Sequence, residues 1–131
     1  MSQANVEIVQ ALIEAWNAGD MDACRELYKP NVIVRTVADW PEPGPYVGRD
    51  AAVRFHERLR DTWDINAVVP ISDFIHDGNR VAVRYLWHGA GHGPDMNLEA
   101  TLVFRMRDGG IFEQEFFWDH EAALEAADLS E

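Results

Sequence analysis

Three side chains of this sequence combine proton-transfer chemistry with positions beside a predicted apolar pocket: Asp39, Tyr85 and His88. Asp39 follows a short β-branched segment, residues 31–37, and precedes a proline-rich loop, residues 40–46. A carboxylate held over apolar side chains loses hydration, which raises its pKa and suits it to general acid–base catalysis. The alternative is a turn aspartate that accepts hydrogen bonds from nearby backbone amides. Both interpretations of Asp39 stay open at this point.

Two histidines and an aspartate flank a glycine-rich segment, residues 89–94: His88, His92 and Asp95. Metal sites normally need three or four converging ligands, and this spacing fixes no ligand beyond these. The sequence also has no nucleophile elbow, phosphate-binding loop or zinc motif. We therefore expect no metal and no cofactor, ATP and NAD included.

Composition narrows the function classes further. The 131 residues predict a single domain, residues 1–131, and an apolar content of 47% with 26% charged residues is typical of a globular protein. A net charge of −12 argues against nucleic acid and anionic membranes as partners, because phosphate groups attract basic surfaces. We expect a cytoplasmic protein, since no signal peptide or long apolar run is seen and the single Cys24 forms no internal disulfide.

Residues 71–119 contain four segments of alternating apolar residues joined by turn residues, which predicts antiparallel strands. We expect a two-residue turn at residues 78–79, a longer connection at 89–94 and a three-residue loop at 108–110. The cross-strand pairs that follow are Asp77–Arg80, Asp73–Arg84, Phe74–Val83, Trp87–Leu98, Tyr85–Ala100, Arg105–Glu113 and Phe104–Gln114.

This register places nearly all the large apolar side chains on one face of the sheet, and a slip of one residue would move them to the other. The residues on this face are Phe74, Val81, Val83, Tyr85, Trp87, Leu98, Ala100, Leu102, Phe104, Met106, Phe112, Phe116 and Trp118. The opposite face is charged, with four apolar residues among the charges: Leu86, Val103, Ile111 and Phe117. Apolar residues inside a polar rim favour a homodimer contact there.

The first half of the chain predicts helices that cover the apolar face. A helical stripe runs through residues 4–18, and a second helix begins after Asp20, includes Tyr28 and ends at Pro30. After the strand at 31–37, a third helix begins near Asp50. Residues 120–127 predict a short closing helix. Helices followed by antiparallel strands define an α+β domain with a mainly antiparallel sheet.

Three segments carry a resemblance to a known family: residues 16–20 (WNAGD), 46–52 (YVGRDAA) and 110–119 (GIFEQEFFWD). In this order on these elements, the chain resembles the SnoaL-like branch of the nuclear transport factor 2-like superfamily. The resemblance implies a cone-shaped fold with a cavity between sheet and helices, and a homodimer. Members include ketosteroid isomerases, limonene epoxide hydrolases, polyketide cyclases, dehydratases and binding modules, so fold alone does not fix a reaction.

The catalytic positions of two such enzymes are mostly apolar in this chain. The positions matching ketosteroid isomerases are Leu12, Thr36 and Leu102, and those matching limonene epoxide hydrolases are Val34, Thr36, Tyr85, Trp87 and Phe116. Neither reaction mechanism is therefore supported.

The remaining candidate is a pocket for a small, largely apolar ligand, polycyclic or terpenoid. Its expected lining is Trp16, Val34, Thr36, Trp40, Tyr85, Trp87, Leu98, Ala100, Phe116 and Trp118. Ala100 lies among much larger neighbours and would leave space for the ligand. Two alternatives stay open: an enzyme for acid–base isomerisation, cyclisation or hydration that uses Asp39, Tyr85 and His88, and a dimeric interaction module whose side chains fill the core.

Overall fold

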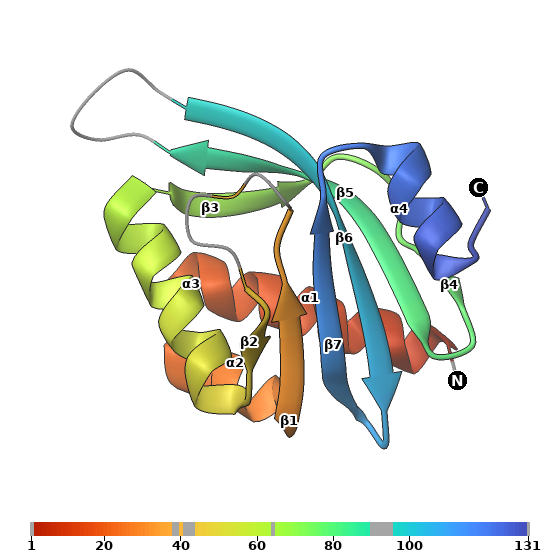
Figure 1. The fold of residues 1–131 in the computed structure, drawn as a ribbon, viewed down its shortest axis with the longest axis horizontal. Coiled ribbons are helices and arrows are strands. Elements are labelled where there is room, and N and C mark those ends of the chain that lie inside the picture. The colour runs from red at the N-terminus through yellow and green to blue at the C-terminus, as the bar shows by residue number, and fades with distance from the viewer. Residues whose placement is uncertain (1, 38–39, 41–43, 64, 90–95, 131) are drawn as a thin grey trace.

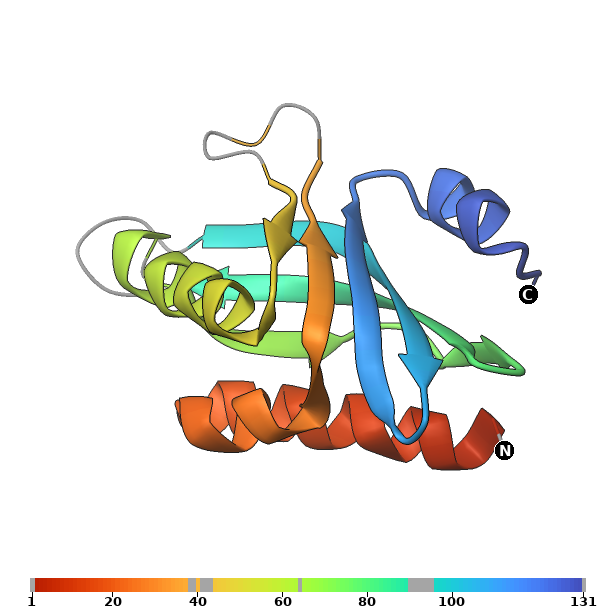
Figure 2. The same cartoon turned by 60° about the horizontal axis from the view of Figure 1, so that its bottom comes forward.

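The computed structural model describes residues 2–37, 40, 44–63, 65–89 and 96–130. In chain order the elements are α1 (Ser2–Ala18), α2 (Met21–Leu27), β1 (Tyr28–Arg35), β2 (Tyr46–Val47), α3 (Arg49–Trp63), β3 (Ile65–Pro70), β4 (Ile75–Asp77), β5 (Arg80–Gly89), β6 (Met96–Arg107), β7 (Gly110–Phe117) and α4 (His120–Ala127). The strands form one curved sheet in the order β2-β1-β7-β6-β5-β3, with β4 paired to β5. Helices α1, α2 and α3 cover one face, here called the inner face, and α4 lies on the outer face (Figures 1 and 2). The predicted α+β class is confirmed.

The helices bury the stripes that the sequence predicts. In α1 the buried side chains are Val6, Val9, Leu12, Ile13 and Trp16, and in α3 they include Ala52, Phe55 and Leu59. Among the described residues, no helix is both long enough and apolar enough to cross a bilayer.

The second helix is shorter than predicted. Asp20 caps it, since its carboxylate accepts a hydrogen bond from the Ala23 backbone amide at 3.1 Å. The helix ends at Leu27, and Tyr28 begins β1 instead of facing inward from the helix. Pro30 therefore lies within β1, where the parallel ladder to β7 is irregular between Tyr28 and Ile33. Proline has no amide proton to donate to a regular ladder. It is tolerated here because the ladder is already interrupted.

Two strands were not expected from the sequence, β2 and β3. The short β2 pairs with β1 in the segment predicted as loop, and β3 pairs with β5 at its far end, Val68 opposite Trp87. Because β3 and β4 share β5, the predicted pairing of residues 73–77 is only partly correct. Asp77 lies opposite Arg80 as predicted, but the ladder ends at Ile75.

The predicted partners Asp73–Arg84 and Phe74–Val83 are therefore wrong. The backbone of Arg84 instead forms hydrogen bonds with Ile71 and Ser72. Its carbonyl accepts from the Ile71 amide, and its amide donates to Ser72 Oγ. The chain bends between β3 and β4, which shifts the register that a straight hairpin would have.

The last hairpin follows the predicted pairing by a different route. Arg105 lies opposite Glu113 and Phe104 opposite Gln114, as predicted. The turn, however, has two residues, Asp108 and Gly109, both at positive φ, and a bulge follows at Arg105–Met106. The shorter turn shifts the register by one residue and the bulge shifts it back.

Because of this bulge, two neighbouring residues, Ile111 and Phe112, lie on faces of the sheet opposite to those predicted. Ile111 pairs with Met106 and lies in the inner core, whereas the sequence placed it on the outer face. Phe112, predicted to face inward, instead lies beside the Arg107 guanidinium, whose Cζ atom is 4.5 Å from the centroid of the Phe112 ring. The rest of the predicted inner face holds, including the pairs Trp87–Leu98 and Tyr85–Ala100.

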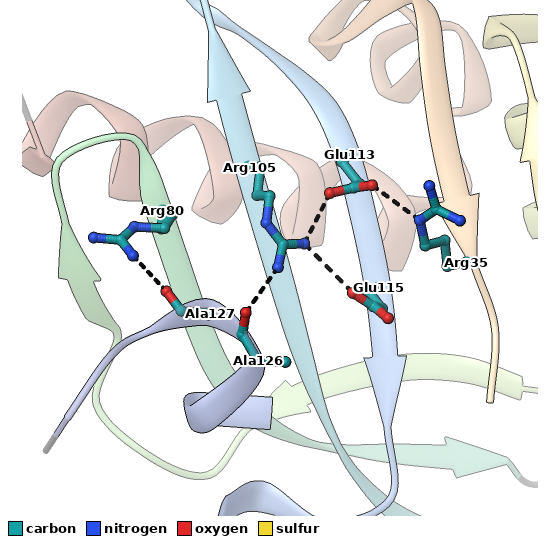
Figure 3. Close-up of polar contacts among 7 residues, drawn as sticks. All are labelled: Arg35, Arg80, Arg105, Glu113, Glu115, Ala126 and Ala127. Atoms are coloured by element: carbon teal, nitrogen blue, oxygen red, sulfur yellow. Dashed lines mark hydrogen bonds and ion pairs between the residues drawn. The ribbon is translucent and has the colours of Figure 1, made fainter. Parts of the chain in front are cut away.

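The outer face carries α4, as the sequence did not anticipate. Buried Ala82 and Val103 pack against the helix in a second, smaller core, with Phe117 beside them. Two arginines hold the C-terminal carbonyls of α4: Arg80 donates to Ala127 O at 2.6 Å and Arg105 to Ala126 O at 3.2 Å (Figure 3). Cations are favourable at this end of a helix.

The surface predicted as a dimer contact contains Leu86, Val103, Ile111 and Phe117, and these four residues are not exposed together on the outer face. Val103 is covered by α4 and Ile111 points to the other face.

Candidate ligand-binding site

A cluster of rings closes one end of the inner face. Trp40 and Trp118 pack against Trp87, with ring centroids 5.7 and 6.3 Å away, and lie 6.2 Å from each other. Trp118 is 43% exposed, so this cluster meets solvent. Behind it lies an outer cavity of about 10 Å³, whose lining is Thr36, Val37, Trp40, Phe55, Trp87, Ala100, Phe116 and Trp118.

A second, inner cavity lies deeper between the sheet and helices α1 and α3. Its volume is about 30 Å³, room for roughly two water molecules. Its lining is Leu12, Ile13, Trp16, His56, Leu59, Val68, Trp87, Leu102, Phe104, Gln114 and Phe116. Trp87 and Phe116 line both cavities and form the partition between them, with ring centroids 5.5 Å apart.

Seven of the ten predicted pocket residues line one or both cavities: Trp16, Thr36, Trp40, Trp87, Ala100, Phe116 and Trp118. Val34, Tyr85 and Leu98 line neither. Val34 and Tyr85 are fully buried in the same core, and Leu98 packs against it from a partly buried position. Thr36 has a structural role as well, because its hydroxyl accepts a hydrogen bond from the Gly44 amide at 3.1 Å.

A buried hydrogen-bonded network, here called the polar wall, contributes Trp16, His56 and Gln114 to the lining of the inner cavity. Tyr28 is not part of that lining but links His56 to Gln114. The Trp16 indole N–H donates to His56 Nδ1 at 3.3 Å, and the Tyr28 hydroxyl lies 2.9 Å from His56 Nε2. The same hydroxyl donates to Gln114 Oε1 at 2.6 Å. Because an indole only donates, Nδ1 must accept and the imidazole proton resides on Nε2. The chain therefore runs from Trp16 through His56 and Tyr28 to Gln114.

Burial determines the charge state of the two titratable groups in this hydrogen-bonded network, His56 and Tyr28. Desolvation lowers the pKa of His56 to about 4, and it raises the pKa of Tyr28 well above its ordinary value. Both groups are therefore neutral near pH 7. With Nδ1 accepting from Trp16 and Nε2 donating to Tyr28, His56 has no free lone pair with which to remove a proton from a ligand.

The segment Trp16–Asp20 holds this wall in place. The Arg60 guanidinium donates to Trp16 O and lies 4.8 Å from the centroid of the Trp16 ring. Asn17 clamps the edge of the sheet, since its amide nitrogen donates to Val68 O at 3.0 Å and its oxygen accepts from Val68 N at 2.7 Å. Gly19 then turns the chain at φ 75°, a conformation that favours glycine.

Of the three predicted catalytic residues, Tyr85 and His88 lie on opposite faces of β5 and are therefore not brought together. Asp39 lies outside the described residues. Tyr85 is fully buried on the inner face, where desolvation raises the pKa of its hydroxyl, and its oxygen has no hydrogen-bond partner among the described residues. His88 belongs to the opposite face from Trp87, and its Nδ1 lies 2.9 Å from Asn97 Oδ1.

His92 and Asp95 also lie outside the described residues, so the prediction that they bind no metal is not tested. Within the described part of the chain, no three histidine, cysteine or acidic side chains converge as metal ligands. Cys24 is buried, and desolvation raises the pKa of its thiol to about 11, which keeps it protonated.

The sequence analysis missed the polar wall: Tyr28, His56 and Gln114. Two signals were present. Position 56 falls within the helical stripe of Ala52, Phe55 and Leu59, and the correctly predicted pair Phe104–Gln114 requires Gln114 to share the inner face.

A curved sheet with helices packed on one face is the fold that this chain shares with solved structures of nuclear transport factor 2-like and ketosteroid isomerase-like proteins. A family model described as the SnoaL-like domain matches residues 9–114, and the chain belongs to this family. No curated protein sequence matches the chain.

Three solved structures illustrate the shared fold. One, proposed to be a SnoaL-like polyketide cyclase from Jannaschia sp. CCS1, is 23% identical with a TM-score of 0.77, covering 96% of this chain and 92% of that one. TerC, co-crystallised with polyporic acid, is 20% identical with a TM-score of 0.76 over 95% and 98%. A protein of ketosteroid isomerase-like fold from Catenulispora acidiphila DSM 44928, in complex with trimethylamine, is 19% identical with a TM-score of 0.73 over 95% and 94%.

Proposed function

We propose that the protein binds a small, largely apolar molecule at the ring-lined end of the inner face. One observation carries this proposal: a continuous series of aromatic rings leads from partly exposed Trp118 and Trp40 to the buried partition of Trp87 and Phe116, with a cavity on each side of that partition. The similarity to TerC, which was crystallised with an organic compound, supports a ligand in this fold.

Binding requires side chains to move. The two cavities are far smaller than the roughly 300 Å³ at which ligand pockets usually begin. A ligand would enter where Trp40 and Trp118 now touch, and would join the cavities by rotating Trp87 or Phe116. Burying about 200 Å² of apolar ligand surface yields about 5 kcal/mol, a dissociation constant near 0.2 mM before these costs.

The small cavity volumes favour a second candidate, an interaction module whose core is filled by its own side chains. The two functions differ in one property, since only the first gives saturable binding of small apolar compounds. The acid–base alternative has less support, because His56 is neutral and fully hydrogen-bonded and His88 lies on the other face.

Ala100 and Ala82 offer a matched test of the proposed binding. Both are buried alanines on neighbouring strands, but Ala100 lines the outer cavity and Ala82 packs under α4. Leucine at either site overpacks the core at a cost of about 1–3 kcal/mol. We predict that Ala100→Leu abolishes tryptophan quenching by a panel of polyaromatic and terpenoid compounds, whereas Ala82→Leu retains it.

The contrary outcomes are equally clear. If no compound changes the fluorescence of the wild type, the filled-core module is the better description. If Ala100→Leu binds as well as the wild type, the ligand site lies elsewhere in the protein.

We also propose that the chain forms a homodimer through the part of the outer face that α4 leaves open. Val69 and Ile71 are 44% and 45% exposed, and Val69 pairs with partly buried Leu86 on this face. The ion pair Arg84–Glu99, 2.7 Å long, borders them. Exposed apolar side chains beside such charges suit an interface core with a polar rim.

A further inference from the structure

The side-chain amide of Gln114 has a fixed orientation. The Tyr28 oxygen already receives the proton of His56 Nε2, so the hydroxyl proton of Tyr28 must go to another acceptor. Gln114 Oε1 is that acceptor at 2.6 Å. The amide NH₂ of Gln114 is therefore turned away from the Tyr28 hydroxyl.

Among the described residues, no acceptor contacts the NH₂ group of Gln114. Its neighbour is His56 Nε2 at 3.4 Å, and that nitrogen carries a proton because Nδ1 accepts from Trp16. Two donors facing each other do not form a hydrogen bond. A buried amide donor without an acceptor is destabilising, so a partner within reach would be favoured.

The inner cavity is where that partner would come from. Gln114 lines it, and its other walls are aliphatic and aromatic side chains together with His56 and the Trp16 indole. No described side chain that lines this cavity carries a charge at neutral pH. An anion would lose its hydration here without gaining a counterion, so a neutral acceptor fits and a carboxylate does not.

We propose that Gln114 determines ligand specificity by donating a hydrogen bond from its amide to a neutral oxygen, the carbonyl of an aromatic ketone or quinone. This deepens the proposed binding function and rests on it. The apolar part of such a ligand lies at the Trp87–Phe116 partition, and its oxygen points to the inner wall. Gln114 is therefore the residue that distinguishes a ketone from a hydrocarbon of the same shape.

The test compares two compounds of equal shape, acetophenone and α-methylstyrene, in which a CH₂ group replaces the carbonyl oxygen. Binding is measured by NMR titration of the wild type, Gln114→Met and a control, Thr101→Val. Methionine keeps the length of glutamine without its donor. The control breaks a buried hydrogen bond of similar kind on the outer face, Thr101 Oγ1 to His120 Nδ1 at 2.9 Å, and leaves the cavity untouched.

We expect the ratio of acetophenone to α-methylstyrene affinity to fall roughly three- to tenfold in Gln114→Met, the worth of one hydrogen bond, and to stay at the wild-type value in Thr101→Val. An equal ratio in all three proteins, with both compounds bound, would overturn the role of Gln114 while leaving the binding function intact. If neither compound binds the wild type, the binding function itself fails and the inference fails with it.

A second measurement needs no variant and covers the case in which Gln114→Met does not fold. The infrared carbonyl stretch of acetophenone bound to the wild type should shift to lower wavenumber than in hexane, because a hydrogen bond weakens the C=O bond. A bound band at the hexane position would overturn the proposal.

Discussion

Acidification should destabilise this protein through His56 in particular. Burial lowers the pKa of this imidazole from 6.5 to about 4 in the folded state. The unfolded chain therefore takes up a proton on His56 between these two values while the folded protein does not. The folded state keeps the full benefit of neutral His56 above pH 6.5, and this benefit is lost as the pH falls toward 4.

The size of the effect follows from the same two values. The interval between 6.5 and about 4 corresponds to about 3 kcal/mol of folding free energy. Neighbouring groups do not mask it, because the pKa of Tyr28 is raised by burial and its hydroxyl stays neutral throughout this range. The effect of His56 is isolated by comparing the wild type with a variant that lacks this imidazole.

The assay is urea unfolding of the wild type and His56→Gln at several pH values between 7 and 4. Glutamine retains hydrogen-bonding groups but does not titrate. We expect the stability of the wild type relative to the variant to decrease by about 3 kcal/mol from pH 7 to pH 4. A difference that stays constant over this range would show that His56 is not buried and neutral as described.

Two further predictions concern the sheet edges. Asn17→Ala removes both side-chain hydrogen bonds to Val68 and should lower the free energy of unfolding by about 1–3 kcal/mol. The control Gln10→Ala, on the exposed face of the same helix, should change it by less than about 0.5 kcal/mol. Equal effects of the two variants would contradict the role of Asn17 at the sheet edge. Val69→Asp should convert a dimer near 30 kDa to a monomer near 15 kDa in sedimentation velocity, twice and once the chain mass of 14.9 kDa, and a wild type that sediments as a monomer at micromolar concentration would refute the dimer.

Much of the sheet could be predicted because side-chain alternation and turn chemistry agreed. Trp87 and Ala100 could be assigned to the inner face from parity alone, and their cross-strand partners were correct. The exchange of Ile111 and Phe112 could not be foreseen in the same way. It depends on Asp108, which adopts φ 49° and so allows a turn of two residues, whereas the sequence analysis predicted a loop of three residues.

The ring-lined part of the site was also predictable, since large apolar side chains on one face converge wherever the helices cover them. The polar wall was not, because its members meet only through the tertiary fold. Trp16, Tyr28, His56 and Gln114 come from four different elements, and the link from Tyr28 to Gln114 spans 86 positions. Tyr28 was further obscured by its expected place in a helix, whereas it begins β1.

The central claim, a small-molecule site at the ring-lined end of the inner face, is tested most directly by the indole N–H signals in ¹H–¹⁵N NMR spectra. On titration with 2-acetylnaphthalene, we expect the signals of Trp87, Trp118 and Trp40 to shift progressively and saturate. Backbone amides of α4, such as Ala123 and Leu124 on the outer face, should remain unchanged. Shifts confined to α4, or indole signals that do not respond up to millimolar ligand, would contradict the account.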